Sequence, residues 1–140
     1  MDNLLSVKVS FRITGDLIDP SEITKHLGLQ PDKSHRKGDA NEVVSKKGRI
    51  IRYSPFSSGL WSINTKLCDT CDFNSHLKNL LDHIYPLKNE LNELSLRGYK
   101  MDIFCGVFAQ EVDQPGFIIC PENLLKIGEL NISLGMDFYR

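Results

Sequence analysis

The sequence has only four cysteines, a single tryptophan and no long apolar run. The best candidate for such a run, residues 116–120, has the length of a strand, whereas a helix that crosses a bilayer needs about 20 apolar residues. No basic region followed by an apolar stretch opens the chain, so we expect no secretory signal and a cytoplasmic location. A membrane is therefore not expected as a partner.

Neither sign of charge dominates, because 17 Lys and Arg stand against 18 Asp and Glu, for a net charge of −1. Proteins that bind nucleic acid normally carry a clustered basic excess that neutralises phosphates. The composition shows none, so nucleic acid is not an expected partner. The hydrophobic share of 41% and the charged share of 25% are typical of a globular protein, and the length predicts one domain over residues 1–140.

The first half of the chain contains one strand, one helix and a long connection. Apolar and polar residues alternate over residues 5–13, which predicts a strand with every apolar side chain on one face. Asp19 as N-cap, Pro20 at the first helical position and Gly28 as a stop predict a short helix. Residues 30–47 are polar and follow neither apolar period, which indicates a loop of unusual length.

The second half alternates strands and helices. Two predicted strands, residues 49–53 and 60–65, are joined by a turn-rich connection typical of a hairpin. Apolar residues at steps of three and four predict a helix over residues 73–94, kinked or split at Pro86. Further patterns predict strands over residues 101–108, 116–120 and 132–138, and a helix over residues 121–127.

The resulting order, β-α-β-β-α-β-β-α-β, predicts an α+β fold. We expect an antiparallel sheet with helices packed on one face, in which a ferredoxin-like βαββαβ core is extended by a C-terminal βαβ. Residues 101–108 are apolar on both alternations, which favours a central strand covered on two faces over one whose outer face meets another subunit. A self-complementary edge strand would allow a homodimer.

One polar run in the predicted loop is the candidate binding site. It brings two fixed cations, a hydroxyl, an imidazole and a carboxylate within six residues. Arginine can hold a carboxylate or phosphate with two parallel hydrogen bonds, and lysine adds a point charge. We predict that this run binds a small anionic ligand or an acidic peptide segment; the alternative is a solvated turn with internal ion pairs. The predicted ligand-binding residues in the run are Ser34, His35, Arg36, Lys37 and Asp39.

Trp61, the lone tryptophan, lies on the predicted strand 60–65. Its ring would bind planar or cationic groups beside the polar run, so it joins the candidate site. A single tryptophan on an alternating strand is, however, more often a core residue.

Cys68 and Cys71 form a C-x-x-C motif before the capped start of the long helix, which resembles a redox motif. The predicted hairpin upstream argues against the parallel βαβ setting that thioredoxin-like chemistry uses. Zinc would need two more ligands, and His76 and His83 lie seven residues apart. We therefore expect thiols, with neither a metal nor a cofactor.

Three functions are compatible with these patterns. The first is a non-catalytic binding domain for an anionic ligand or acidic segment. The second is an immunity-type protein that neutralises a toxin by occluding its active site. The third is a hydrolytic enzyme with His35 as general base, although the sequence contains no G-x-S-x-G, P-loop or H-E-x-x-H motif.

Several segments together form a family-like pattern: Phe11-Arg12-Ile13-Thr14-Gly15-Asp16, Asp19-Pro20, Ser34-His35-Arg36-Lys37-Gly38-Asp39, Gly59-Leu60-Trp61 and Ile132-Ser133-Leu134-Gly135. In these the chain resembles a bacterial family catalogued as domain-of-unknown-function family 4279, over nearly its whole length. The resemblance implies a bacterial cytoplasmic protein with the family's fold, and it carries no established activity. Cys68 and Cys71 lie outside the pattern.

Overall fold

The computed structural model describes residues 4–110 and 116–139 and contains a main sheet of five strands in the order β2-β5-β1-β6-β7. Neighbouring strands are antiparallel except β6 and β7, which are parallel, so the sheet is mixed but mostly antiparallel. Its strands are β1 (Leu4–Gly15), β2 (Lys33–His35), β5 (Gly59–Asn64), β6 (Lys100–Gln110) and β7 (Ser133–Tyr139).

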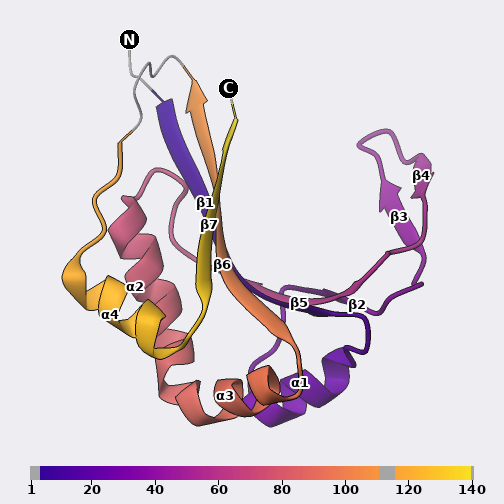
Figure 1. Ribbon diagram of the computed structural model, residues 1–140. Helices are drawn as coiled ribbons and strands as arrows, with labels where there is room; N and C mark the ends of the chain where they lie inside the picture. Colours follow the sequence, from indigo (N-terminus) through magenta and orange to yellow (C-terminus); the bar gives the residue numbers. More distant parts are fainter. Residues whose placement is uncertain (1–3, 111–115, 140) are drawn as a thin grey trace.

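The helices cover the convex face of this bent sheet (Figure 1), which confirms the α+β class. They are α1 (Pro20–Leu27), α2 (Phe73–Ile84), the 3-10 helix η1 (Tyr85–Leu87), α3 (Lys88–Leu96) and α4 (Pro121–Glu129). Asp19 caps α1 by accepting a hydrogen bond from the Ser21 amide, and Asp72 caps α2 in the same way at the Ser75 amide. None of the described helices is long and apolar enough to cross a membrane.

The long helical segment is split at Pro86, as predicted. Proline has no amide hydrogen to donate to the preceding turn, so the α-helix ends at Ile84 and restarts at Lys88 after the 3-10 turn. The apolar stripe continues on both sides of the break, because Leu91 and Leu94 are buried like the apolar residues of α2.

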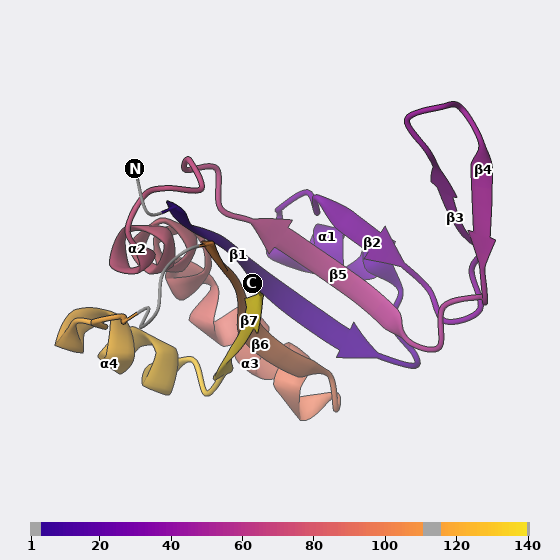
Figure 2. The ribbon, with the colours of Figure 1, turned by 90° about the horizontal axis from the view of Figure 1, so that it is seen from above.

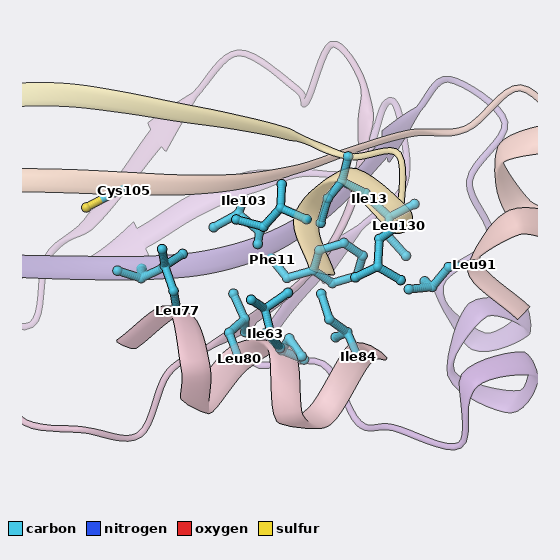
Figure 3. Packing of buried hydrophobic residues seen from close by; sticks show 14 of the residues in the cluster. Phe11, Ile13, Ile63, Leu77, Leu80, Ile84, Leu91, Ile103, Cys105 and Leu130 are labelled. Atoms are coloured by element: carbon cyan, nitrogen blue, oxygen red, sulfur yellow. The ribbon is translucent and has the colours of Figure 1, made fainter. Parts of the chain in front are cut away.

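The core lies between the helices and one face of the sheet (Figure 3). The alternation of β1 produces this face: Val7, Val9, Phe11 and Ile13 are all buried. Full burial of such a side chain stabilises the fold by about 1.5–3 kcal/mol. The one-sided pattern of β1 thus determines which face of the sheet the helices cover.

The opposite face of the sheet is concave and not covered by helices (Figure 1). On β6, Cys105 and Val107 point into the core, whereas Phe104 and Phe108 alternate to the open face, where Phe108 is 37% exposed. The prediction that this strand is covered on two faces is therefore wrong. We call this surface the open face.

Two short strands form a separate sheet that projects from the body (Figure 2). Strand β3 (Asn41–Val44) pairs with β4 (Ile50–Tyr53), whereas β5 pairs with β1 and β2. The predicted loop over residues 30–47 contains β2 and β3, and the predicted hairpin between residues 49–53 and 60–65 is wrong. Each short strand places two apolar residues side by side, so neither shows the alternation of a half-buried strand. We call residues 41–53 the arm.

Residues 116–120 are not a strand, contrary to prediction. Phe117 and Ile119 pack against the core, and the Cys120 amide donates to the side chain of Asn74 on α2 at 3.0 Å, so the segment bonds to a helix instead of a ladder. The C-terminal unit is β6-α4-β7, with its two strands parallel. The ferredoxin-like order of the first six elements is not confirmed.

Gly59 permits the close approach of β5 to the end of β1. A Cβ at this position would lie 2.6 Å from the Gly15 carbonyl oxygen and 2.8 Å from Ile18 Cβ. We expect Gly59→Ala to lower the free energy of unfolding by about 1–3 kcal/mol, because two backbone segments must separate.

Gly128→Ala is the matched control for this substitution. Gly128 lies in α4, and a Cβ added there would have no other atom within 4 Å, so alanine should raise stability by about 0.5–1 kcal/mol through helix propensity. Urea unfolding of both variants measures the difference, and equal effects of the two substitutions would contradict the close approach at Gly59.

Candidate functional site

The predicted cations lie beside the start of α1, where each faces a carboxylate. Arg36 Nη2 is 2.8 Å from Asp19 Oδ1, and Lys37 Nζ is 3.3 Å from Asp16 Oδ2. The side chains are 58% and 54% exposed, so both pairs are solvated surface ion pairs. The hydrogen bond from Ser21, aided by the charge of Arg36, lowers the pKa of Asp19. The two cations therefore tie the polar run to the connection between β1 and α1.

The rest of the polar run fixes the base of the arm. The Gly38 amide donates to the Phe56 carbonyl at 2.7 Å, and the Phe56 amide donates to the Asp39 carbonyl at 3.1 Å. The His35 ring stacks on the Phe56 ring with centroids 3.4 Å apart. The side chain of Asp39 accepts from the Arg36 amide at 2.8 Å, so it closes a turn within the run. The two chain segments that enter and leave the arm are thus held together.

Trp61 is fully buried, with a relative exposure of 0%. Its indole nitrogen donates to Thr24 Oγ1 on α1 at 3.0 Å, and Ser34 lies opposite it across the β2–β5 pair. The ring therefore belongs to the core and has no free face for a ligand. The structure brings Arg36, Lys37 and Asp39 together at the surface but leaves the indole out of that cluster.

Sequence reasoning missed the arm as a functional candidate. Its five large apolar side chains are between 41% and 68% exposed. Cross-strand register and the alternation of strands place three of them on one face and two on the other. The first face carries Val43, Ile51 and Tyr53, and the second carries Val44 and Ile50.

The tip of the arm presents cations. Ser45 and Gly48 close the turn, since the Ser45 amide donates to the Arg49 carbonyl at 2.7 Å and the Gly48 amide donates to the Ser45 carbonyl at 2.9 Å. Gly48 has a φ of 79°, which favours glycine. Lys46, Lys47 and Arg49 stand exposed around this turn.

The arm belongs to a strongly basic segment. Residues 33–53 contain seven Lys and Arg and two Asp and Glu, whereas the rest of the chain contains ten and sixteen, so the charges are +5 and −6. The near-zero net charge therefore conceals a separation along the chain. Counting charge by segment would have found it, and the composition alone did not.

A hollow of about 460 Å³ lies on the open face. Phe104, Phe108 and Tyr139 line one side, and the latter two rings stack with centroids 5.1 Å apart. Lys8 also lines the hollow, with its ammonium 5.7 Å from the centre of the Phe108 ring. Neighbouring Arg12 is held by Asp102 through two hydrogen bonds of 2.8 and 2.6 Å. The open face thus combines exposed aromatic rings with charges of both signs.

Burial lowers the pKa of His35, whose Nδ1 has no hydrogen-bond partner within the described part of the chain. The unfolded chain then binds a proton more readily than the folded protein. The stability that depends on neutral His35 is fully present above the ordinary histidine pKa of about 6.5 and declines as the pH falls below it.

We expect His35→Phe to weaken this pH dependence, because phenylalanine keeps the stack on Phe56 and cannot be protonated. Urea unfolding at about pH 7.5 and about pH 5.5 measures the loss of stability in each protein. The wild type should lose more than the variant. An equal loss in both would show that His35 does not contribute to the acid sensitivity.

Comparison with models of known families matches residues 5–140 to a domain of unknown function, DUF4279. The resemblance noted from the sequence is thereby confirmed. No curated protein and no solved structure matches the chain.

Proposed function

We propose that this chain, which belongs to the DUF4279 family of domains of unknown function, is a non-catalytic domain that binds an acidic segment of a protein partner through its arm. The observation that carries the proposal is the arm itself, a projecting hairpin that is apolar on both faces and basic at its tip.

Contact with a second surface would stabilise an arm of this kind. Strands of four residues in a two-stranded hairpin are marginally stable in water, and three or more strands or a packed face are normally needed. A protein partner that covers Val44 and Ile50 on one side, or Val43 and Ile51 on the other, would supply that contact. A small molecule would cover too little of it.

The charge of the arm selects an acidic partner. Residues 41–53 contain four Lys and Arg and one Glu, a charge of +3, and opposite charge on a partner speeds association and disfavours basic competitors. Within the arm, Glu42 is already paired with Arg52 at 3.1 Å, which leaves the three cations of the tip available. The partner is thus a protein with carboxylates beside apolar side chains.

The open face offers a second contact for the same partner. It lies on the concave side of the sheet, at one end of which the arm projects (Figure 1). Exposed aromatic rings such as Phe108 and Tyr139 are the residue type that protein interfaces bury preferentially.

The other functions considered from the sequence have less support. A small anion at Arg36 and Lys37 would have to displace Asp19 and Asp16. Hydrolysis with His35 as general base is disfavoured, because the ring stacks on Phe56 and its Nδ1 is buried. An immunity-type inhibitor belongs to the class proposed here, and a toxin gene next to this one would identify it.

Two arm variants test the proposal. Val44→Thr combined with Ile50→Thr keeps β-branched residues in the strands but removes apolar contacts, and Lys46→Glu combined with Lys47→Glu reverses the charge of the tip. The immobilised wild type should retain one stoichiometric partner from nuclease-treated lysate, and titration calorimetry with that purified partner should show about tenfold or greater weakening for each variant.

Matched controls lie outside the arm. Leu96→Thr removes an exposed apolar side chain at the end of α3, and Lys25→Glu combined with Arg97→Glu reverses two exposed charges at the ends of α1 and α3. These variants should bind like the wild type. A partner retained equally by the arm variants, or a partner without an acidic surface, would refute the proposal.

Arg36→Ala separates this function from small-anion binding. In a thermal-shift screen of phosphorylated and carboxylated metabolites, we expect no compound to stabilise the wild type more than Arg36→Ala. The reason is that the Arg36 guanidinium is already paired with Asp19. A ligand that stabilises the wild type and not the variant would show that the polar run, and not the arm, is the binding site.

A further inference from the structure

We propose that Cys68 and Cys71 form a reversible thiol–disulfide couple, in which Cys68 attacks an incoming disulfide and Cys71 resolves the product. This inference concerns a different part of the molecule from the arm and does not depend on the proposed protein partner.

The motif lies next to an antiparallel part of the sheet, because β5 pairs antiparallel with both β1 and β2. The predicted β4–β5 hairpin is absent, but β5 has no parallel neighbour of the thioredoxin kind, so the redox chemistry depends on the turn that carries the two cysteines. The motif lies in the connection from strand β5 to helix α2, with Cys71 directly before the N-cap Asp72. A strand, a C-x-x-C turn and a helix therefore follow one another.

The backbone between the two cysteines is already folded as the disulfide requires. The Cys71 amide donates to the Cys68 carbonyl at 3.1 Å, which closes a turn of four residues. Such a turn brings its first and last Cα atoms within about 7 Å, and disulfides span Cα distances of about 4.4–6.8 Å. Oxidation therefore needs little movement of the chain.

The two thiols differ in the way that a nucleophile and a resolving thiol must differ. Cys68 is exposed and Cys71 is half-buried. Hydrogen bonds from Cys71 and from Thr70, whose hydroxyl lies 3.7 Å from Cys68 Sγ, lower the pKa of Cys68. The interaction with Cys68 raises the pKa of Cys71. The accessible sulfur is thus the one that ionises first.

The turn is held in place from both sides. The ring of the buried His76 bonds to the Cys68 carbonyl through Nε2 at 3.0 Å and to the Thr65 hydroxyl through Nδ1 at 2.7 Å. The Val7 amide of β1 donates to the Asp69 carbonyl at 2.9 Å. These bonds fix the backbone of the connection that carries the thiols.

The surroundings favour exchange over metal binding. Among the residues that the structure describes, no three His, Cys, Asp or Glu side chains gather into a ligand set. A C-x-x-C pair without further ligands provides two of the four donors that a structural zinc ion takes.

The reaction is an exchange with a low-molecular-weight disulfide, R–S–S–R. The Cys68 thiolate forms a bond to one sulfur of that molecule, and the S–S bond breaks to release R–S⁻. Cys71 then loses its proton to solvent and attacks Cys68 Sγ, which forms the Cys68–Cys71 disulfide and releases the second R–S⁻. Both cysteines are oxidised, and the disulfide is reduced to two thiols.

Oxidised glutathione is the probe for this step. Folded protein incubated with it should form the Cys68–Cys71 disulfide, identified by peptide mass spectrometry and reversed by reduced glutathione. Cys71→Ser should accumulate the mixed disulfide on Cys68, and Cys68→Ser should react at least about tenfold more slowly at Cys71 than the wild type does at Cys68.

Cys105 is the internal control. Cys105 is buried, and burial raises its pKa to about 11, so it should remain a thiol throughout. Circular dichroism of each variant checks the fold. The proposal would be overturned by a mixed disulfide that persists on wild-type Cys68, or by a Cys71 that reacts with oxidised glutathione in Cys68→Ser as fast as Cys68 does in the wild type.

Discussion

The structure depends on the burial of one face of β1. From Leu5 to Ile13 its apolar residues alternate with polar ones, and the strand lies at the centre of the sheet between β5 and β6. Because β1 supplies apolar side chains to one face alone, the helices gather there. Whatever lies on the other face, including Phe108 and Tyr139, is left in contact with solvent. One alternating strand thus determines both the core and the position of the open face.

The sequence predicted best those elements whose signals are local. Asp19, Pro20 and Gly28 defined α1, and the stripe with Pro86 defined α2 and α3, because caps, prolines and helical periods act within a few residues. Pairing between strands was predicted poorly, since it joins segments that are distant in sequence. Strand β5 pairs with β1 instead of the adjacent β4, and no local pattern distinguishes those partners.

The candidate site shows a related difference between residue type and residue environment. Arginine and lysine bind anions in many proteins, which made Arg36 and Lys37 candidates. The carboxylates that face them come from the connection between β1 and α1, so the sequence of the polar run did not reveal these partners. All segments of the family-like pattern except residues 132–135, which lie next to β6, have members at this point: Asp16, Asp19, Arg36, Lys37 and Gly59 lie around the base of the arm. These residues hold the arm on the body, so their role in the pattern is structural.

The break at Pro86 has a consequence for the shape of the whole sheet. An unbroken helix over Phe73–Leu96 would be a rod of about 36 Å, and a straight rod touches a curved surface along a short length only. Divided by the 3-10 turn, the same segment changes direction and follows the curvature, so that α2 packs beneath β1 while α3 reaches α1 (Figure 1). One proline in the sequence therefore lets a single helical segment cover a curved face along its length.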